Sequence, residues 1–255
     1  MSSWALVTGA TAGIGESFSR LLASHNYNIV LVARDLPRLE ERAKNLEEKY
    51  SIQTQVIQAD LATDEGCMKI EKYIAENHID VLINNAGFGT NKAFTMSSLE
   101  IEQQLLDVLV RTPMRLMHVA LPLMKERNNG IIINVSSVAG YIAGGTYSAS
   151  KSYLTVLSES LNTELSATNV KVSALCPGFT RTEFHQRGKM SMKGLPNFMW
   201  LNADRLVEQS WKDALKGEAV SVPGWQYRVL VFVIQAVPRS LVRKVGMNVR
   251  SKQRR

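Results

Sequence analysis

Two side chains with the chemistry of a proton-transfer pair stand four residues apart. Tyr147 and Lys151 are the first and last residues of the string Tyr-Ser-Ala-Ser-Lys. Ser137 lies upstream, with nine residues between it and Tyr147. Residues four apart on a helix share a face, so the phenol and the ammonium group point the same way. A free phenol titrates near ~10, and a close cation favours its ionised form. The spacing therefore predicts proton transfer at a carbonyl or alcohol oxygen, with Ser137 stabilising the developing charge.

A glycine-rich turn follows the first apolar run of the chain. It has the sequence Thr-Gly-Ala-Thr-Ala-Gly-Ile-Gly at residues 8–15 and precedes an amphipathic stretch. Glycines permit positive φ and close approach of the backbone to a pyrophosphate, and free N–H groups at a helix start favour an anion. A tight turn without a ligand is the alternative. We expect a dinucleotide to contact Gly9, Thr11, Ala12, Gly13, Ile14 and Gly15.

The chain alternates short apolar runs with longer amphipathic stretches. The runs predict strands at Ala5–Thr8, Asn28–Ala33, Gln53–Gln58, Val81–Asn84, Ile131–Val135, Lys171–Leu175 and Ala219–Val222. The clearest helical stretches are Leu39–Tyr50, Glu65–Glu76 and Tyr153–Ala167. This alternation is typical of an α/β fold: a single doubly wound Rossmann-type domain with a parallel seven-stranded sheet and helices on both faces. Ligands of such sheets bind at the carboxyl ends of the strands, where Gly9, Arg34, Asp60, Asn85, Ser137 and Pro177 follow successive runs.

The end of the second run bears on the choice of nucleotide. Ala33 cannot hold a ribose diol, whereas Arg34 can bind a 2′-phosphate in bidentate fashion. Asp35 could serve a diol, but the helix that follows carries Pro37 in its first turn, which favours Asp35 as an N-cap. The sequence therefore favours NADP(H) over NAD(H).

Composition limits the other possibilities. The 255 residues suit one domain, and the two cysteines, Cys67 and Cys176, have no metal spacing, so no metal site is expected. Few cysteines and no signal peptide predict a cytoplasmic location. The net charge is +7, but residues 225–255 hold eight Lys and Arg and no Asp or Glu, which leaves −1 for residues 1–224. A nearly neutral body gives no reason to expect nucleic-acid binding.

These motifs together resemble the short-chain dehydrogenase/reductase family, over residues 4 to about 184. The resemblance rests on the glycine turn, Asp60-Leu61, Asn84-Asn85-Ala86-Gly87, Ser136-Ser137, the Tyr147/Lys151 spacing and Pro177-Gly178. It implies that Asp60, with Leu61, contacts the adenine edge and that Asn85, Ala86 and Gly87 line the adenosine ribose and brace the sheet. It implies that Pro177 and Gly178 border the nicotinamide, with Thr180 and Thr182 reaching its carboxamide or the phosphates. Lys151 would also hold the nicotinamide ribose.

The chain departs from the family pattern in two places. Many members have an Asn where alignment on Leu121-Pro122 places Leu109, and that Asn kinks a helix and holds a relay water. Leucine can hold no water, so the relay must differ or be slower. The loop between Ser137 and Tyr147 is also shorter than usual, and Ser136 is the fallback if Ser137 does not point inward. The alternative to an enzyme is a cofactor-binding regulator or scaffold with weak or lost turnover, favoured by Leu109. Retention of Ser137, Tyr147 and Lys151 favours the enzyme.

The remaining segments bear on substrate and partners. Residues 179–201 resemble the family's lid and are rich in Met and aromatic side chains. Such side chains could simply cover the core, or they could adapt to an apolar small-molecule substrate, which we favour. Residues 225–255 form a basic, apolar extension beyond a body of residues 1–224. Its apolar run, Val229–Ile234, is too short to span a bilayer; it could dock on the body, pair with another subunit or lie on an anionic membrane. The family resemblance implies a homodimer or homotetramer.

Overall fold

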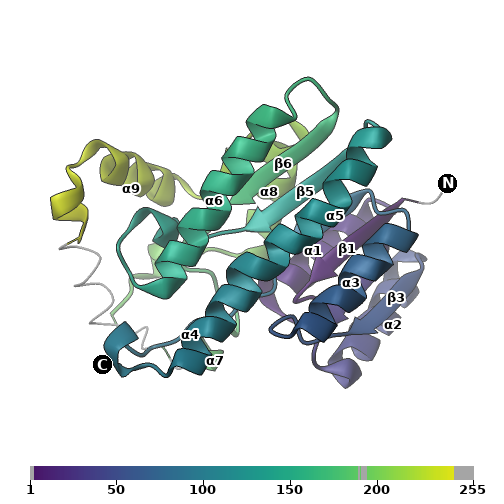
Figure 1. The fold of residues 1–255 in the computed structure, drawn as a ribbon, viewed down its shortest axis with the longest axis horizontal. Helices are drawn as coiled ribbons and strands as arrows, with labels where there is room; N and C mark the ends of the chain where they lie inside the picture. The colour runs from purple at the N-terminus through teal and green to yellow at the C-terminus, as the bar shows by residue number, and fades with distance from the viewer. Residues whose placement is uncertain (1–2, 189, 191–193, 244–255) are drawn as a thin grey trace.

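The computed structural model describes residues 3–188, 190 and 194–243, and these form one parallel sheet between two layers of helices (Figure 1). The strand order is β3-β2-β1-β4-β5-β6-β7. The strands are β1 (Trp4–Thr8), β2 (Asn28–Ala33), β3 (Thr54–Gln58), β4 (Val81–Asn84), β5 (Gly130–Val135), β6 (Val170–Leu175) and β7 (Val220–Ser221). The predicted doubly wound sheet is confirmed, and each predicted strand end lies within one residue of the observed end.

Helices cover both faces of the sheet. They are α1 (Gly13–Ser24), α2 (Leu36–Tyr50), α3 (Asp64–Glu76), α4 (Leu99–Leu106), α5 (Thr112–Glu126), α6 (Thr146–Glu164), α7 (Phe184–Arg187), α8 (Ala203–Leu215) and α9 (Trp225–Ala236). Short turns of other helix types are η1 (Phe94–Met96), η2 (Asp107–Arg111), η3 (Val138–Tyr141) and η4 (Asn197–Met199). The predicted helices at Leu39, Glu65 and Tyr153 are confirmed, but two begin several residues earlier, at Leu36 and Thr146.

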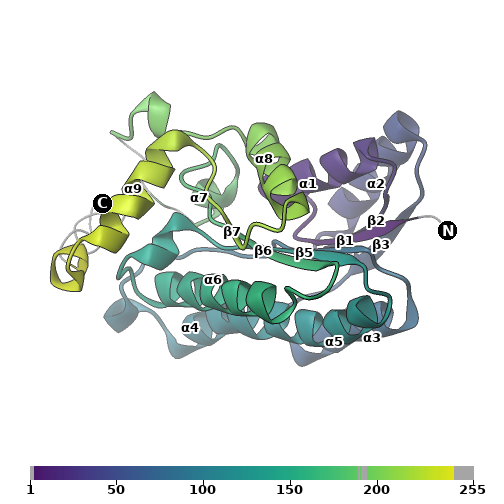
Figure 2. The same ribbon diagram turned by 90° about the horizontal axis from the view of Figure 1, so that it is seen from above.

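Two apolar cores hold these layers together. Figure 2 shows α1, α2 and α8 on one side of the sheet and α3, α5 and α6 on the other. Phe18 of α1 and Trp211 of α8 belong to the first core, and Ile70 of α3 and Leu154 of α6 belong to the second. Since the central strands are buried on both faces, their side chains are largely apolar, as the sequence runs predicted.

The sheet has its topological switch point between β1 and β4. The chain passes from β1 to β2 and β3 on one side, and β4 then returns to pair with the other edge of β1, with Val7 opposite Ile83. The two connections that leave β1 and β4 diverge to opposite faces and open a crevice at the strand ends, which is where such sheets bind ligands. The glycine turn follows β1 and Asn85 follows β4, so both lie at this crevice.

Two segments after β6 lie outside the sheet: the one that leads to α8, and helix α9. The lid segment connects β6 to α8, and α9 extends away from the sheet beyond β7 (Figures 1 and 2). None of the helices in the described ranges is long and apolar enough to cross a bilayer.

Candidate active site

The glycine turn has the geometry of an anion cradle. Gly9 and Gly13 adopt positive φ, 67° and 59°, which disfavours any side chain there. A Cβ on Gly15 would lie 2.3 Å from the Gly9 carbonyl oxygen, so only glycine allows α1 to begin so close to β1. Helix α1 starts after Ala12 with no side-chain cap. Its first N–H groups are thus available to an anion, and the turn, which also carries Thr11 and Ile14, fits the pyrophosphate of a dinucleotide.

Asn85 fastens the end of β4 to this turn. Its side-chain amide donates to the carbonyl oxygens of Thr8, at 2.9 Å, and Gly9, at 3.1 Å. In return the Thr8 hydroxyl accepts from the backbone N–H groups of Asn85 and Ala86. These bonds cross the switch point and hold the two sides of the crevice at a fixed spacing. The bracing role expected of the Asn-Ala-Gly segment is therefore observed.

Ser137, Tyr147 and Lys151 come together from two elements. Ser137 follows β5 and caps η3, where its hydroxyl accepts from the Ala139 N–H at 3.1 Å. Tyr147 lies in the first turn of α6, near enough to Ser137 for that hydroxyl to lower the pKa of the phenol. The Lys151 amino nitrogen lies 5.7 Å from the centre of the Tyr147 ring. Of the two serines, only Ser137 affects the pKa of Tyr147, whereas Ser136 donates to the Lys151 carbonyl and anchors α6.

The electrostatics of this group differ from the sequence expectation. Burial raises the pKa of Tyr147 to about 12, and the hydrogen bond with Ser137 opposes that rise. Burial lowers the pKa of Lys151 to about 8, because an ammonium group loses hydration there. The pKa of Tyr147 is thus raised here, whereas the sequence led us to expect that Lys151 and the oxidised nicotinamide ring lower it. Lys151 is only 4% exposed, and its amino group donates to the Val135 carbonyl at 2.6 Å rather than to the phenol oxygen.

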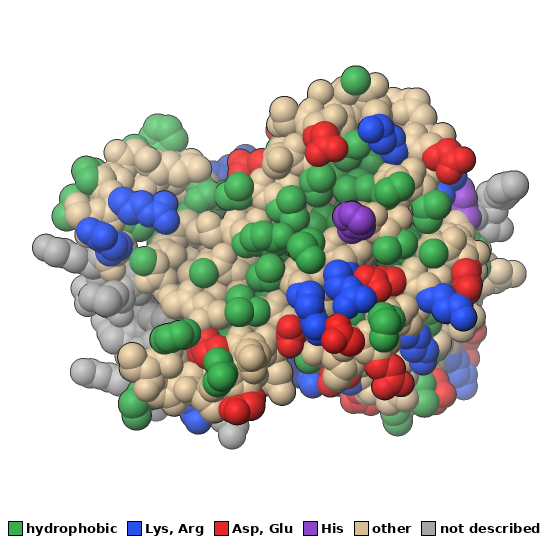
Figure 3. Space-filling view, in the orientation of Figure 1, with side chains coloured by type: hydrophobic (Ala, Val, Ile, Leu, Met, Phe, Trp, Pro, Cys, Tyr) green, Lys and Arg blue, Asp and Glu red, His purple; other side chains and the backbone are tan. Residues whose placement is uncertain are grey.

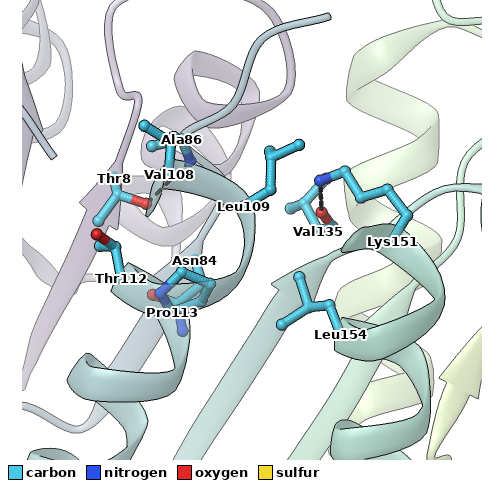
Figure 4. Close-up of a pocket in the computed structure, with 10 residues that line it drawn as sticks. All are labelled: Thr8, Asn84, Ala86, Val108, Leu109, Thr112, Pro113, Val135, Lys151 and Leu154. Atoms are coloured by element: carbon cyan, nitrogen blue, oxygen red, sulfur yellow. Dashed lines mark hydrogen bonds between the residues drawn. The ribbon is translucent and has the colours of Figure 1, made fainter. Parts of the chain in front are cut away.

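A small cavity lies behind Lys151, and Leu109 forms part of its wall (Figure 4). The cavity measures about 10 Å³, close to the minimum for one water, and Thr8, Asn84 and Thr112 add polar groups to its lining. Leu109 sits in the π-helical turn η2, so the chain keeps the kink at this position without an asparagine. A Cβ on Gly87 would lie 2.9 Å from a Leu109 methyl carbon, so glycine makes room for the leucine.

The predicted adenosine end of the site is open. Arg34 is exposed, and among the described residues its side chain has no hydrogen-bond or ion-pair partner. Asp35 caps α2 by accepting from the Arg38 N–H, as the sequence favoured. Asp60 is also exposed, and its carboxylate accepts from the Ala62 N–H, so it caps the turn after β3. Leu61 beside it is buried. These positions leave the Arg34 guanidinium free to meet a phosphate.

The segment after β6 crosses the crevice. The Pro177 carbonyl accepts from the Val138 N–H, so Pro177 borders the Ser137 loop. Thr180 is buried, and its hydroxyl donates to the Gly178 carbonyl, so its side chain contacts the backbone of the loop to which it belongs. Thr182 lies over the glycine turn, with its methyl group 2.9 Å from where a Cβ on Gly13 would be. Of the two threonines, the structure brings only Thr182 to the expected phosphate position.

The lid also covers the predicted substrate side. The Phe184 ring lies 5.9 Å from the Tyr147 ring, and the Met190 methyl group packs over Gly89. Phe179, His185 and Trp200 stack beside them. Met192 falls outside the described residues. The phenol of Tyr147 therefore faces a wall of apolar and aromatic groups.

Two positions that matter to the lid were missed from the sequence. Glu183 forms a two-pronged ion pair with Arg38 of α2. Tyr227 of α9 is buried, accepts from the Phe179 N–H at 2.9 Å and donates to the Met199 carbonyl at 2.6 Å. A Cβ on Gly178 would meet its ring at 2.0 Å. The one signal was Gly178 itself, since glycine permits such close packing.

Comparisons with known proteins identify this arrangement. A family model described as short chain dehydrogenase matches residues 3–192. The chain belongs to the short-chain dehydrogenase family. This short-chain dehydrogenase is 29% identical to the very-long-chain 3-oxoacyl-CoA reductase of Rattus norvegicus over 250 residues, covering 94% of this chain and 75% of that protein.

Solved structures agree in both fold and sequence. A short-chain dehydrogenase from Sphingobium yanoikuyae in complex with NADPH is 30% identical, with a TM-score of 0.83 and coverage of 92% of this chain and 94% of that one. The bulky-bulky ketone specific alcohol dehydrogenase from Comamonas testosteroni is 29% identical, with a TM-score of 0.80 and 92% coverage of each chain. The protein is thus an oxidoreductase of CH–OH and C=O groups that uses a nicotinamide cofactor.

Proposed function

We propose that this short-chain dehydrogenase is an NADP(H)-dependent carbonyl reductase or alcohol dehydrogenase in which Tyr147 is the general acid and base. The observation that carries the proposal is the grouping of three elements at the crevice bounded by the uncapped glycine turn: the Tyr147 ring, the buried Lys151 amino nitrogen 5.7 Å from its centre, and the Ser137 loop. The nicotinamide cofactor, when bound, supplies or accepts the hydride.

The three side chains have distinct roles in the proposed reduction. Tyr147, with a pKa raised to about 12, stays protonated at neutral pH and donates its proton to the carbonyl oxygen as that oxygen gains charge. Ser137 accepts one bond from the Ala139 N–H and lies 3.5 Å from the Pro177 carbonyl; in the proposed reduction its hydroxyl donates to the same substrate oxygen. Lys151 places a positive charge beneath the ring, which stabilises the phenolate left behind.

The polar rim of the crevice would hold the cofactor. The glycine turn and Thr182 would surround the pyrophosphate, and Asn85, Ala86 and Gly87 would line the adenosine ribose. Asp60 and Leu61 would meet the adenine, while Pro177, Gly178 and Thr180 would border the nicotinamide with Lys151. The exposed, unpaired guanidinium of Arg34 supports NADP(H) over NAD(H), because among the described residues it has no partner and Ala33 offers nothing to a diol.

An apolar carbonyl compound or alcohol is the proposed substrate. Phe184 and Met190 face the Tyr147 side of the crevice and can adapt to a bulky apolar group. Two relatives are named for substrates of this kind, a very-long-chain 3-oxoacyl-CoA and bulky ketones. We therefore favour lipid-like, steroid-like or acyl carbonyl groups.

The proposed assembly is a cytoplasmic homodimer or homotetramer. Figure 3 shows hydrophobic side chains gathered over the face formed by α5 and α6. Met114, Tyr153 and Val156 are exposed there, and an exposed apolar band of this kind marks an interface between subunits. We assign residues 1–224 to the catalytic body and residues 225–255 to a basic, apolar C-terminal extension.

Oxidation of NADPH by a graded series of carbonyl compounds tests this function. We expect kcat/KM to rise from small aldehydes to bulky or long-chain ketones, because the lid wall is apolar. NADPH should support a higher kcat/KM than NADH. Failure of every carbonyl compound to oxidise NADPH, or of every alcohol to reduce NADP, would favour the scaffold alternative.

A further inference from the structure

Helix α9 has two opposite apolar stripes, and only one of them is packed. Tyr227 and Val231, one turn apart, are buried against the body. On the other side Trp225, Val229 and Phe232 fall on one face by helical spacing and are 73%, 55% and 72% exposed. Figures 1 and 2 show that α9 projects from the body beyond the sheet.

The outer stripe and the chain that follows it carry positive charge. Arg228, Arg239 and Arg243 are exposed, and residues 244–255 add five more Lys and Arg without any Asp or Glu. In the space-filling view, hydrophobic and basic side chains share the surface of the projecting lobe (Figure 3). A helix with Trp and Phe on one face and Arg at its flanks has the composition of an interfacial helix. Helix α9 ends at Ala236, before Pro238, and is too short to span a bilayer.

We propose that the outer face of α9, with the exposed Arg239 and Arg243 that follow it, docks on an anionic lipid surface. A second copy of this chain on the same face would bring its own Arg228, Arg239 and Arg243 toward the first set, which like-charge repulsion opposes. An anionic leaflet neutralises those charges and buries the Trp225, Val229 and Phe232 side chains in the same contact.

Docking of α9 is linked to the lid through named contacts. Tyr227 holds both ends of the lid segment by its bonds to Phe179 and Met199. Gln226 adds a bond to the Phe198 carbonyl at 2.9 Å. The lid is therefore fixed to the first turn of α9, and a bilayer under α9 lies at the lid side of the molecule. If the substrate is apolar, as the proposed function holds, it reaches the lid directly from the lipid phase.

Sedimentation of the full chain with vesicles tests the docking surface. We expect binding to phosphatidylcholine vesicles that contain phosphatidylglycerol, little binding to phosphatidylcholine alone, and loss of binding at about 1 M salt, where the Debye length is about 3 Å. Arg239→Gln with Arg243→Gln should weaken binding about thirtyfold, a factor of about five per charge. Lys44→Gln with Lys72→Gln, exposed on other helices, is the matched control and should bind like the parent.

Separate variants test how much the apolar side chains of α9 contribute to vesicle binding. Phe232→Ser should weaken vesicle binding at least tenfold, whereas Met68→Ser, a change at another exposed apolar side chain, on α3, should not. All four variants should keep the parent kcat on a small soluble carbonyl compound, so a failure of the proposed reduction is seen separately from a failure of docking.

Three outcomes would overturn the proposal. The first is no binding to anionic vesicles. The second is equal binding of the parent and Phe232→Ser. The third is a parent that is dimeric in solution while Phe232→Ser is monomeric, which would make a second copy the occupant of this face.

Discussion

Glu183 of the lid accepts two hydrogen bonds from the Arg38 guanidinium, at 2.8 and 3.1 Å. Arg38 lies in the first turn of α2, so this ion pair spans the crevice from the adenosine side. Thr182, the neighbour of Glu183, lies over Gly13, so the pair fastens the lid across the glycine turn. The Arg38 guanidinium and a second one, on Arg187, hold the pKa of Glu183 at about 2.

Loss of this ion pair should weaken cofactor binding. Glu183→Gln should raise the dissociation constants of NADPH and NADH alike by about fivefold, because a partly exposed pair contributes up to about 1 kcal/mol. Titration of cofactor fluorescence measures both constants. Arg187→Gln removes only the ion pair within the lid and serves as the control. Equal binding by the parent and Glu183→Gln would show that the ion pair does not hold the lid.

Arg34 should set the preference between the two nucleotides. Arg34→Ala should raise the KM for NADPH at least tenfold and leave the KM for NADH within about twofold, since losing a charge-assisted hydrogen bond to phosphate costs about 1.5–3 kcal/mol. Steady-state kinetics with each nucleotide checks this. Similar Michaelis constants for NADH and NADPH in the parent enzyme would mean that Arg34 does not read the phosphate.

Leu109 should prove compatible with catalysis. Leu109→Asn places an amide in an apolar position that is 1% exposed, so we expect a loss of about 1–3 kcal/mol in the free energy of unfolding. The turn η2 already supplies the kink, so kcat should stay within about threefold of the parent. Denaturant unfolding and steady-state turnover give the two values. A tenfold gain in kcat would instead show that the leucine slows proton transfer.

The buried Lys151 should make stability depend on pH. Its folded pKa, about 8, lies below the ordinary lysine value of 10.5, so the unfolded chain binds more protons between these values. The cost of burying the charge is complete below pH 8 and disappears as pH rises toward 10.5. The free energy of unfolding of the parent, relative to Lys151→Met, should therefore rise by about 2–3 kcal/mol from about pH 8 to 10. A flat difference would contradict the lowered pKa.

Patterns among residues close in sequence were enough to predict the sheet and the residues at the carboxyl ends of its strands. Apolar runs predicted strand positions within one residue, because buried parallel strands leave little choice of side chain. The fixed spacing of Tyr147 and Lys151 placed them on one helix face, and Asp35 proved to be a cap. These features depend on neighbours close in sequence, so sequence alone contains them.

The lid and the electrostatics could not be predicted in the same way. Arg38 and Glu183 are 145 positions apart, and Tyr227 reaches back 48 positions to Phe179, so no periodicity marks either pair. The pKa of Tyr147 depends on burial and on where the Lys151 amino group points, which is toward Val135. A spacing of four residues shows that two side chains share a face and leaves their hydrogen-bond partners open.

Turnover by Tyr147→Phe tests the central assignment most directly. The change removes one oxygen from a side chain whose ring stays packed against Phe184, so the fold and the nucleotide site should persist. We predict that NADPH still binds with a dissociation constant within about twofold of the parent, while kcat falls at least about a thousandfold, within the range for loss of a general acid. Binding intact with a kcat near that of the parent would contradict the account.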